Sequence, residues 1–346
     1  MISLKDIRAG HTCSGLLVVK DSSVRPTRNQ SSYLHLVLTD GTRTVRAKKW
    51  DYCGFPYKKG TVVVVSGIVE EYNGSLDLTV ANIRPAYEHE YTPGQFLPVH
   101  PDRDKLWNRL VEYIESIKDK NLRDFLQKDV FGSSGVRERF VSAPAASTHH
   151  HAFIGGLLCH TVSVTDMCFG LACKRNVDRD MLLAGALVHD IGKIDAYDWS
   201  GALIKRTDRG ELHDHIVLGV MLLSKSYTLS SSNLDRNRFD LLLHMVVSHH
   251  GTKEKGSPVE PRTAEAEILH YADELDATLD KISNARNNVE DGEPWTERIY
   301  GRQRRYYISP AEKQLEEVTG VLKDNFSDKP EENILNEDAF LVEEEF

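Results

Sequence analysis

The sequence lacks several features that would assign it to a specialised class of protein. No stretch approaches the roughly 18–20 consecutive apolar residues that a membrane-spanning helix needs. Its first residues carry no basic segment followed by an apolar one, so we expect a cytoplasmic protein with no membrane partner. The five cysteines are odd in number and form no CxxC pair, which argues against a disulfide framework or a zinc ribbon.

An excess of positive charge is also absent from the chain as a whole, but not from its beginning. The net charge of −9 argues against nucleic-acid binding over the whole surface. Residues 1–85, however, hold 12 Lys and Arg against 7 Asp and Glu, whereas residues 328–346 hold eight acidic residues and one lysine. A basic N-terminal region can hold a polyanion even in an acidic protein.

Five short segments rich in β-branched residues occupy the N-terminal region. Turn signals separate several of them, namely Asp40-Gly41, Lys59-Gly60 and Asn73-Gly74. Five strands within so short a region predict an OB-like β-barrel over residues 1–84. The predicted strands are Ser14–Lys20, Tyr33–Leu38, Thr44–Trp50, Thr61–Gly67 and Leu76–Val80.

Aromatic and basic residues alternate in this region and include Tyr33, Arg46, Lys48 and Trp50. Aromatic faces in a cationic groove can stack bases and follow phosphates, as in proteins that bind single-stranded nucleic acid. The alternative is that the aromatic residues belong to the barrel core and the basic residues to a solvated face.

The rest of the chain is predicted to be helical after a linker. Residues 85–103 contain four prolines and little periodicity, which is typical of a linker. Apolar residues then recur at helical spacing, so we expect an all-α domain over residues 104–310, interrupted by a loop or short hairpin at Tyr197–Arg209. Residues 311–346 are assigned to a C-terminal helix and the acidic tail.

The segment Met181–Lys193 suggests where the chemistry lies. Its first half is apolar and indicates a buried helix, yet His189, Asp190 and Lys193 follow immediately. Such groups are costly to place against a core unless something there uses them. Gly192 is expected to let the backbone turn away after the pair. The segment therefore points to a metal-dependent enzyme.

Eleven of the 15 histidines fall between His149 and His270, where Asp190 and Asp273 accompany them. Several lie beside a glycine or a predicted helix end, and helix ends that converge on one cavity can build a metal site. Any one of these histidines can equally be a surface or core residue, and His244 and His270 are explained by helix position alone. The joint pattern is formed by His149–His151, His160, His189, His213, His215, His244, His249, His250 and His270.

The order His160, His189-Asp190, Asp273 resembles that of the HD-domain metal-dependent phosphohydrolases. The segments His150–Thr161, His189–Lys193 and Tyr271–Ala277, behind an OB-like barrel, are similar to the YhaM-type 3′-5′ exoribonucleases. This resemblance extends to about Pro310. Cys159 departs from it, because HD proteins often carry an acidic residue before the first histidine.

The resemblance implies a two-metal site. Asp190 would bridge the ions, with His160, His189 and Asp273 on one and His215, His249 and His250 on the other. Lys193 would contact phosphate as a point charge. A mixed imidazole and carboxylate site favours Mn²⁺, Fe²⁺, Co²⁺ or Ni²⁺ over Mg²⁺, and Mn²⁺ is our choice.

The resemblance leaves two segments with more than one interpretation. His150 and His151 are candidates for lining the substrate path or for protonating the leaving 3′-oxygen, but they can equally pack under the Gly155-Gly156 turn. The segment Arg298–Tyr307, with Arg302 and Arg305, is a candidate clamp for an RNA backbone or a plain surface segment.

The leading hypothesis is a hydrolase that removes 5′-mononucleotides from the 3′ end of single-stranded RNA, with single-stranded DNA as a second substrate. An alternative is a phosphohydrolase of a small nucleotide or cyclic dinucleotide with a regulatory barrel. A third is a nucleic-acid-binding module whose second domain is inactive, although retention of all the expected ligands argues against it. The sequence leaves a homo-oligomer open.

Overall fold

The computed structural model describes residues 2–27, 29, 31–72, 74–147, 151–173, 176–286, 289, 293–299 and 301–309. The chain divides into two compact units, residues 1–280 and 281–346, which we describe separately. The predicted C-terminal helix and acidic tail, residues 311–346, lie outside the described residues.

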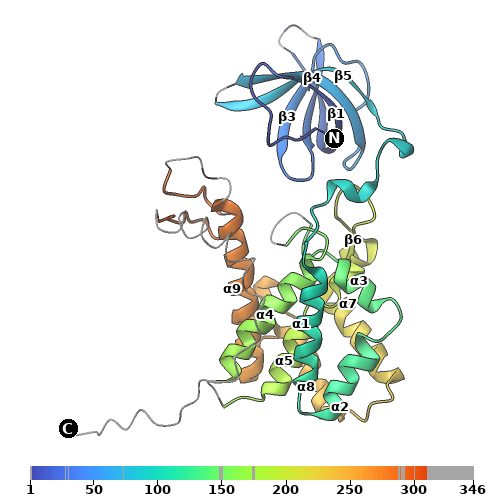
Figure 1. Ribbon diagram of the computed structural model, residues 1–346, viewed down its shortest axis with the longest axis vertical. Coiled ribbons are helices and arrows are strands. Elements are labelled where there is room, and N and C mark those ends of the chain that lie inside the picture. The colour runs from blue at the N-terminus through green and yellow to red at the C-terminus, as the bar shows by residue number, and fades with distance from the viewer. Residues whose placement is uncertain are drawn as a thin grey trace, which may run out of the picture. The chain divides into compact units, whose positions relative to one another are not determined.

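The first part of the chain forms the predicted barrel. Five strands close in the order β1-β2-β3-β5-β4, and Figure 1 shows them in blue to cyan. Neighbouring strands are antiparallel except β3 and β5, which pair in parallel and complete the barrel together with the β1–β4 pair. The strands are β1 (Thr12–Pro26), β2 (Ser32–Thr39), β3 (Thr44–Lys49), β4 (Val62–Tyr72) and β5 (Ser75–Pro85).

Alternation of side chains explains why these segments form a barrel. In β2, Leu34, Leu36 and Leu38 are fully buried, because every second residue of a strand faces the same side. The β2–β3 hairpin turns at Asp40-Gly41, where Gly41 has a φ of 95° and the Asp40 carboxylate accepts hydrogen bonds from the Thr42 and Arg43 amides. The predicted five-stranded barrel is confirmed.

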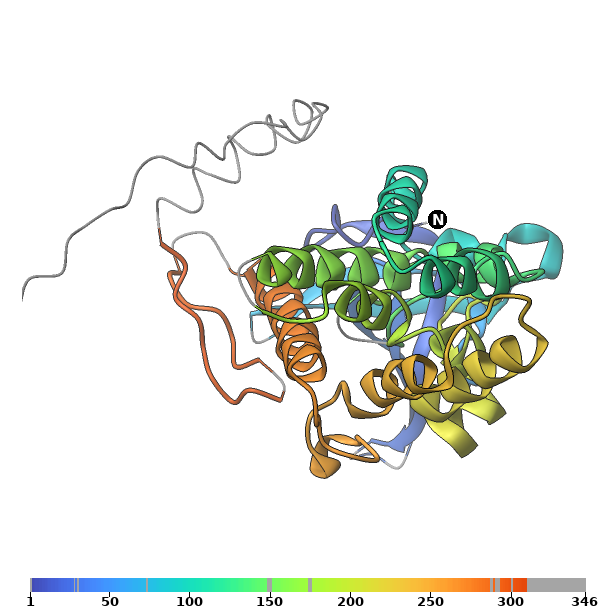
Figure 2. The same cartoon turned by 90° about the horizontal axis from the view of Figure 1, so that it is seen from below.

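The segment after β5 contains two short 3₁₀ turns, η1 (Glu88–Glu90) and η2 (Pro93–Phe96), and leads into helices. The α9 helix (orange) runs beside α4 (green) in Figures 1 and 2, and the Ser163 hydroxyl of α4 donates to the Asp276 carboxylate of α9. The helices are α1 (Arg103–Glu115), α2 (Lys120–Asp124), the π-helical turn η3 (Phe125–Val130), α3 (Val136–Ser142), α4 (Gly156–Ala172), α5 (Arg179–Val188), α6 (Lys193–Ala196), α7 (Asp208–Leu229), α8 (Arg236–Ser248), η4 (Lys253–Lys255) and α9 (Ala264–Arg286).

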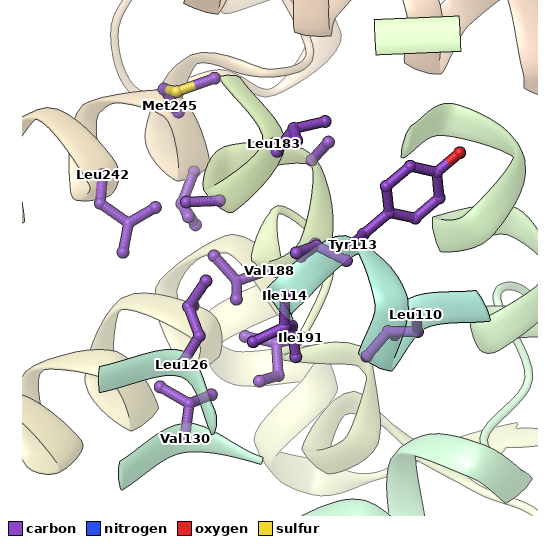
Figure 3. Packing of buried hydrophobic residues seen from close by; sticks show 14 of the residues in the cluster. Leu110, Tyr113, Ile114, Leu126, Val130, Leu183, Val188, Ile191, Leu242 and Met245 are labelled. Atoms are coloured by element: carbon purple, nitrogen blue, oxygen red, sulfur yellow. The ribbon is translucent and has the colours of Figure 1, made fainter. Parts of the chain in front are cut away.

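The α5 helix lies at the centre of the helical core. Every residue from Met181 to Val188 is buried, and α5 packs against α4 and α8. Figure 3 shows Leu183 and Val188 of α5 among side chains from α1, η3 and α8, with the Tyr113 hydroxyl directed away from the hydrocarbon cluster. A helix buried on all sides is a rigid support for the residues that follow it.

Three further expectations concern the local structure. Residues Tyr197–Asp198 (β6) and Lys205–Arg206 (β7) form a two-stranded sheet, as predicted for this interruption. All five cysteines are free thiols. Among the helices in the described residues, none has the length and apolarity to cross a membrane.

Candidate metal centre

Four helices deliver histidines to one place. His160 lies in the second turn of α4, His189 follows the end of α5, His215 belongs to α7 and His249 follows the end of α8. The rings form a continuous series, with centroid separations of 5.2 Å for His160–His189, 5.1 Å for His189–His249 and 5.7 Å for His215–His249. The structure thus brings together residues that are up to 89 positions apart in sequence (249 − 160 = 89).

Asp190 lies between two groups of ligand atoms. Its Oδ2 is 3.3 Å from His160 Nε2 and 3.4 Å from His189 Nε2. Its Oδ1 is 3.3 Å from His215 Nε2 and 3.6 Å from His249 Nε2. One carboxylate therefore presents a different oxygen to each pair of imidazoles.

Each pair of imidazoles has a third potential ligand. Asp273 Oδ1 of α9 is 3.1 Å from His160 Nε2 and 3.8 Å from His189 Nε2. His250 joins His215 and His249 in a group whose ligand atoms all lie within 4.8 Å of one another. We call His160, His189 and Asp273 the first set, and His215, His249 and His250 the second set.

The outward-facing ring nitrogens fix the tautomers. Nδ1 of His189 lies 2.8 Å from the Ala186 carbonyl oxygen, and Nδ1 of His249 lies 2.7 Å from that of Val246. His250 Nδ1 lies 3.0 Å from the Lys255 carbonyl oxygen. A carbonyl oxygen only accepts hydrogen bonds, so each Nδ1 carries the proton and each Nε2 presents a lone pair to the centre.

The centre contains more hydrogen-bond acceptors than donors to satisfy them. His160 Nδ1 is 2.7 Å from the Asp276 carboxylate, and its Nε2 faces the Nε2 of His189 at 3.1 Å. Asp190 Oδ1, His215 Nε2 and His249 Nε2 are buried with no hydrogen-bond partner. Unpaired buried acceptors are strongly unfavourable, and a cation between them removes the penalty. These nitrogen and oxygen donors fit divalent transition-metal ions.

Burial and charge keep Asp190 and His249 in the forms that bind metal, whereas, against the effect of burial, the Asp190, Asp273 and Asp276 carboxylates raise the pKa of His160 well above its ordinary value. Burial alone would raise the pKa of Asp190, but Lys193 and the neighbouring imidazoles outweigh it and hold that pKa well below its usual range. Burial, together with His250, lowers the pKa of His249 well below its ordinary value. Asp190 is therefore an anion and His249 a neutral imidazole, which are the forms that bind metal.

Lys193 and Gly192 lie beside residues of the centre. The Lys193 ammonium lies 2.5 Å from Asp190 Oδ2, and the residue is 7% exposed. The backbone turns at residues 189–192, between α5 and α6, and Gly192 has right-handed φ and ψ of −66° and −14° there. A glycine is required at position 192 because there is no room for a side chain: a Cβ there would lie 1.9 Å from the His215 carbonyl oxygen.

Of the two histidines proposed beside the Gly155-Gly156 turn, His150 lies outside the described residues. His151 is buried, and its Nε2 lies 2.9 Å from the Asp276 oxygen that also contacts His160. His151 is therefore linked to the centre through Asp276 and His160. Its carbonyl oxygen also lies against Gly156, where a Cβ would approach it to 1.9 Å.

The predicted nucleic-acid contacts lie on the two units. In the barrel, the Tyr33 and Trp50 rings are 5.1 Å apart, while Arg46 and Lys48 each lie 2.9 Å from the Asp77 carboxylate. In the second unit, Arg305 donates to the Thr296 carbonyl and lies over the Trp295 ring, and Arg302 is partly exposed.

Sequence reasoning missed two carboxylates that contact the histidines from outside. Asp276 accepts from His160 and His151, and Asp214 Oδ1 lies 2.6 Å from His215 Nδ1. Asp276 could have been found from the sequence, because it lies one helical turn after the predicted ligand Asp273. His244 and His270 lie outside the two sets; His270 Nδ1 hydrogen-bonds the His249 carbonyl oxygen.

Comparisons with known proteins identify the same region. The HD domain model matches residues 157–278. The chain is 33% identical over 308 residues to the 3′-5′ exoribonuclease YhaM of Bacillus subtilis. This match covers 87% of this chain and 96% of the relative. It is also 33% identical over 301 residues to YhaM of Geobacillus sp., covering 85% of this chain and 90% of the relative.

Among solved structures, the chain is similar to a domain of replication protein A from Methanococcus maripaludis. The match covers 24% of this chain and 92% of that domain, at 23% identity and a TM-score of 0.22.

The HD domain implies bound divalent metal, and the two sets of histidine and aspartate can hold it. The resemblance inferred from the sequence is confirmed by full-length relatives at 33% identity, and the chain belongs to the family of the 3′-5′ exoribonuclease YhaM.

Proposed function

We propose that this protein is a metal-dependent 3′-5′ exoribonuclease that releases 5′-mononucleotides from single-stranded RNA. One observation supports it most: the two oxygens of Asp190 face two separate sets of ligands. Hydrolysis of a phosphodiester requires an in-line water and neutralisation of phosphoryl charge. The direction of degradation and the RNA substrate follow the names of the relatives.

We assign one ion to the first set with Asp190 Oδ2 and a second ion to the second set with Asp190 Oδ1. Two such ions, when bound, neutralise the phosphoryl oxygens and activate water. The five imidazoles favour Mn²⁺, Fe²⁺, Co²⁺ or Ni²⁺ over Mg²⁺, which prefers oxygen ligands, and we favour Mn²⁺.

Lys193 has two roles in this proposal. Its ammonium neutralises part of the Asp190 charge, which keeps the buried carboxylate ionised. The same ammonium has further N–H groups to donate to a phosphate oxygen that enters beside Asp190. His151 acts through Asp276 on His160 rather than on the leaving group, because Asp276 lies between the two rings.

The barrel is proposed to hold the RNA strand. Trp50 is 49% exposed and lies beside Tyr33, so the pair offers ring faces to bases. Arg46 and Lys48 lie on the adjoining strand and can exchange Asp77 for phosphate oxygens. Such contacts do not distinguish ribose from deoxyribose, so single-stranded DNA is expected to bind as well. Arg302 and Arg305 are proposed to contact the backbone from the second unit.

We further propose domain boundaries that follow from these roles. Residues 1–84 form the strand-binding barrel, 85–103 the linker and 104–310 the hydrolytic domain. Two element ends support this proposal to within one residue: β5 ends at Pro85 and α1 begins at Arg103.

Digestion of a labelled RNA tests the function. A 5′-labelled single-stranded RNA incubated with Mn²⁺ should shorten stepwise, with 5′-mononucleotides as the product and no reaction in EDTA. The Asp240→Asn protein, altered at a surface carboxylate paired with Arg236, should behave as the wild type. Intact RNA alongside hydrolysis of a mononucleotide or cyclic dinucleotide would show that the substrate is a small molecule.

A further inference from the structure

Two side chains beside the candidate metal centre have unusual backbone conformations. Among the described residues from 86 to 286, His151 and Asp214 are the non-glycine residues with positive φ, at 51° and 56°. Asp214 contacts His215 of the second set directly, and His151 reaches His160 of the first set through Asp276. Strained backbone persists where the surrounding structure enforces it, and it is concentrated at functional sites.

Asp214 interrupts α7 in a region that is almost restricted to glycine, with φ of 56° and ψ of 165°. Its Oδ1 lies 2.6 Å from the backbone nitrogen of His215 and 2.6 Å from Nδ1 of the same residue. Side chains at adjacent positions of a regular helix do not face each other, so this contact requires the interruption. Arg206 Nη2 lies 3.3 Å from the same carboxylate oxygen and holds it in place.

On the side of the first set, hydrogen bonds hold both the backbone and the ring of His151 in place. Its backbone N–H donates to Asp280 at 3.2 Å, and its carbonyl oxygen accepts from the amides of Ala145 and Phe153. The ring then reaches Asp276, which accepts from His160 Nδ1 at 2.7 Å. The chain of contacts therefore ends at an imidazole of the first set.

We propose that Asp214 and His151 are positioning residues, each of which uses a left-handed backbone to fix the tautomer and orientation of one metal-binding histidine. Asp214 acts on His215 and therefore on the second ion; His151 acts through Asp276 on His160 and therefore on the first. This inference rests on the two-ion site proposed above. Residues that hold metal-binding histidines in this way typically change metal affinity about 10–100-fold when removed.

Three variants at position 214 separate strain from hydrogen bonding. Asp214→Gly removes both, so the metal-free protein in EDTA should melt at a higher temperature while one of two Mn²⁺ ions binds about 10–100-fold more weakly. Asp214→Ala removes the acceptor and keeps the strain, so it should weaken that ion without raising the melting temperature. Asp214→Asn retains an acceptor oxygen and keeps the same backbone strain as the wild type, and should restore binding to within a few-fold of the wild type.

His151→Gly should weaken the other ion by a similar factor, and the double variant with Asp214→Gly should weaken both additively. Calorimetric titration of the metal-free, full-length protein with Mn²⁺ gives both affinities, and the visible spectrum of the Co²⁺ form reports changed coordination. Asp51→Gly is the matched control, because Asp51 has a φ of 51° in the barrel. It should relieve strain without changing either affinity.

Wild-type affinities for both ions in Asp214→Gly and His151→Gly would overturn the positioning role and leave the two-ion site intact. A wild-type protein that binds no Mn²⁺ or Co²⁺ would overturn the two-ion site and this inference together. A loss of both ions in Asp214→Gly alone would contradict the assignment of one residue to one ion.

Discussion

Asp190 is the single residue on which both proposed ions depend. Its side chain is almost fully buried, and its two oxygens face different sets of imidazoles. Asp190→Asn keeps the size of the side chain but removes the negative charge and one acceptor oxygen. We expect the variant to bind neither ion tightly and to lose at least about 1000-fold in activity, because metal assistance supplies several kcal/mol to such reactions.

Metal analysis after gel filtration checks this prediction, with Asp240→Asn as a control of the same chemistry at an exposed site. Two ions retained in Asp190→Asn would rule out the bridging role.

Gly192 shows how a small residue shapes the centre without chemistry of its own. A Cβ at this position would lie 1.9 Å from the His215 carbonyl oxygen and 2.4 Å from the Gly219 nitrogen. Gly192→Ala should therefore force the segment after Asp190 away from α7, lower the melting temperature by several degrees and weaken metal binding.

Gly170→Ala provides the matched control, because Gly170 is in α4 and a Cβ there meets nothing within 4 Å. It should stabilise the protein by about 0.5–1 kcal/mol through a lower backbone entropy of the unfolded chain. Thermal unfolding of the two variants side by side measures both effects; equal melting temperatures would contradict the packing argument.

Part of the metal centre could be predicted from the sequence, because imidazoles and carboxylates directly after a fully apolar helix usually have a functional role. His189 and Asp190 stand out for this reason next to Met181–Val188. Asp214 carries no such signal, because its contact with His215 depends on a backbone conformation that no residue type announces. The close approach of Gly192 to α7 carries no signal either, because a glycine required for close packing has the same sequence signature as one required for a turn.

At the scale of elements, strands were easier to predict than their order. β-Branched runs and turn dipeptides locate all five strands, but the parallel pairing of β3 with β5 joins residues 31 positions apart at Arg46 and Asp77 (77 − 46 = 31). That pairing also brings a carboxylate between Arg46 and Lys48, which the sequence did not predict. Local propensity determines the strands, whereas closure of the barrel is a property of the whole domain.

The exposed aromatic pair gives a prediction for the barrel. Trp50→Ala should weaken binding of single-stranded RNA by about 1–3 kcal/mol, the usual effect of removing one stacking ring. Hydrolysis of a small phosphodiester should be unchanged, because Trp50 belongs to the barrel and is a member of neither metal set. Fluorescence anisotropy in EDTA measures affinity without turnover.

The control for this variant is Tyr87→Ala, which removes an exposed aromatic ring after the end of β5. Equal RNA affinities in the two variants would mean that the Tyr33–Trp50 pair does not bind the strand.

For the molecule as a whole, the acceptor-rich centre should make stability depend on metal. Ions that bind the native state alone stabilise it by about 2.7 kcal/mol each when their concentration is 100 times the dissociation constant. We therefore expect Mn²⁺ to raise the melting temperature by several degrees and EDTA to reverse the shift, whereas Asp190→Asn should show neither. A wild-type melting temperature that is independent of Mn²⁺ would contradict this prediction.

The separation of charge along the chain gives a last prediction for the whole molecule. The protein carries a net charge of −9, yet residues 1–85 are basic, so RNA binding should weaken with salt through a few local contacts. If Arg46 and Lys48 each neutralise one phosphate, replacing both with Gln should reduce the slope of log affinity against log salt by about 1.4, since each contact on a single strand contributes about 0.7. Lys120→Gln with Lys128→Gln is the matched control, because these two lysines also share one carboxylate, Asp124, but lie in the helical domain. A slope that changes equally in both double variants would place the RNA contacts elsewhere, and an unchanged slope would mean that Asp77 keeps Arg46 and Lys48 from the phosphates.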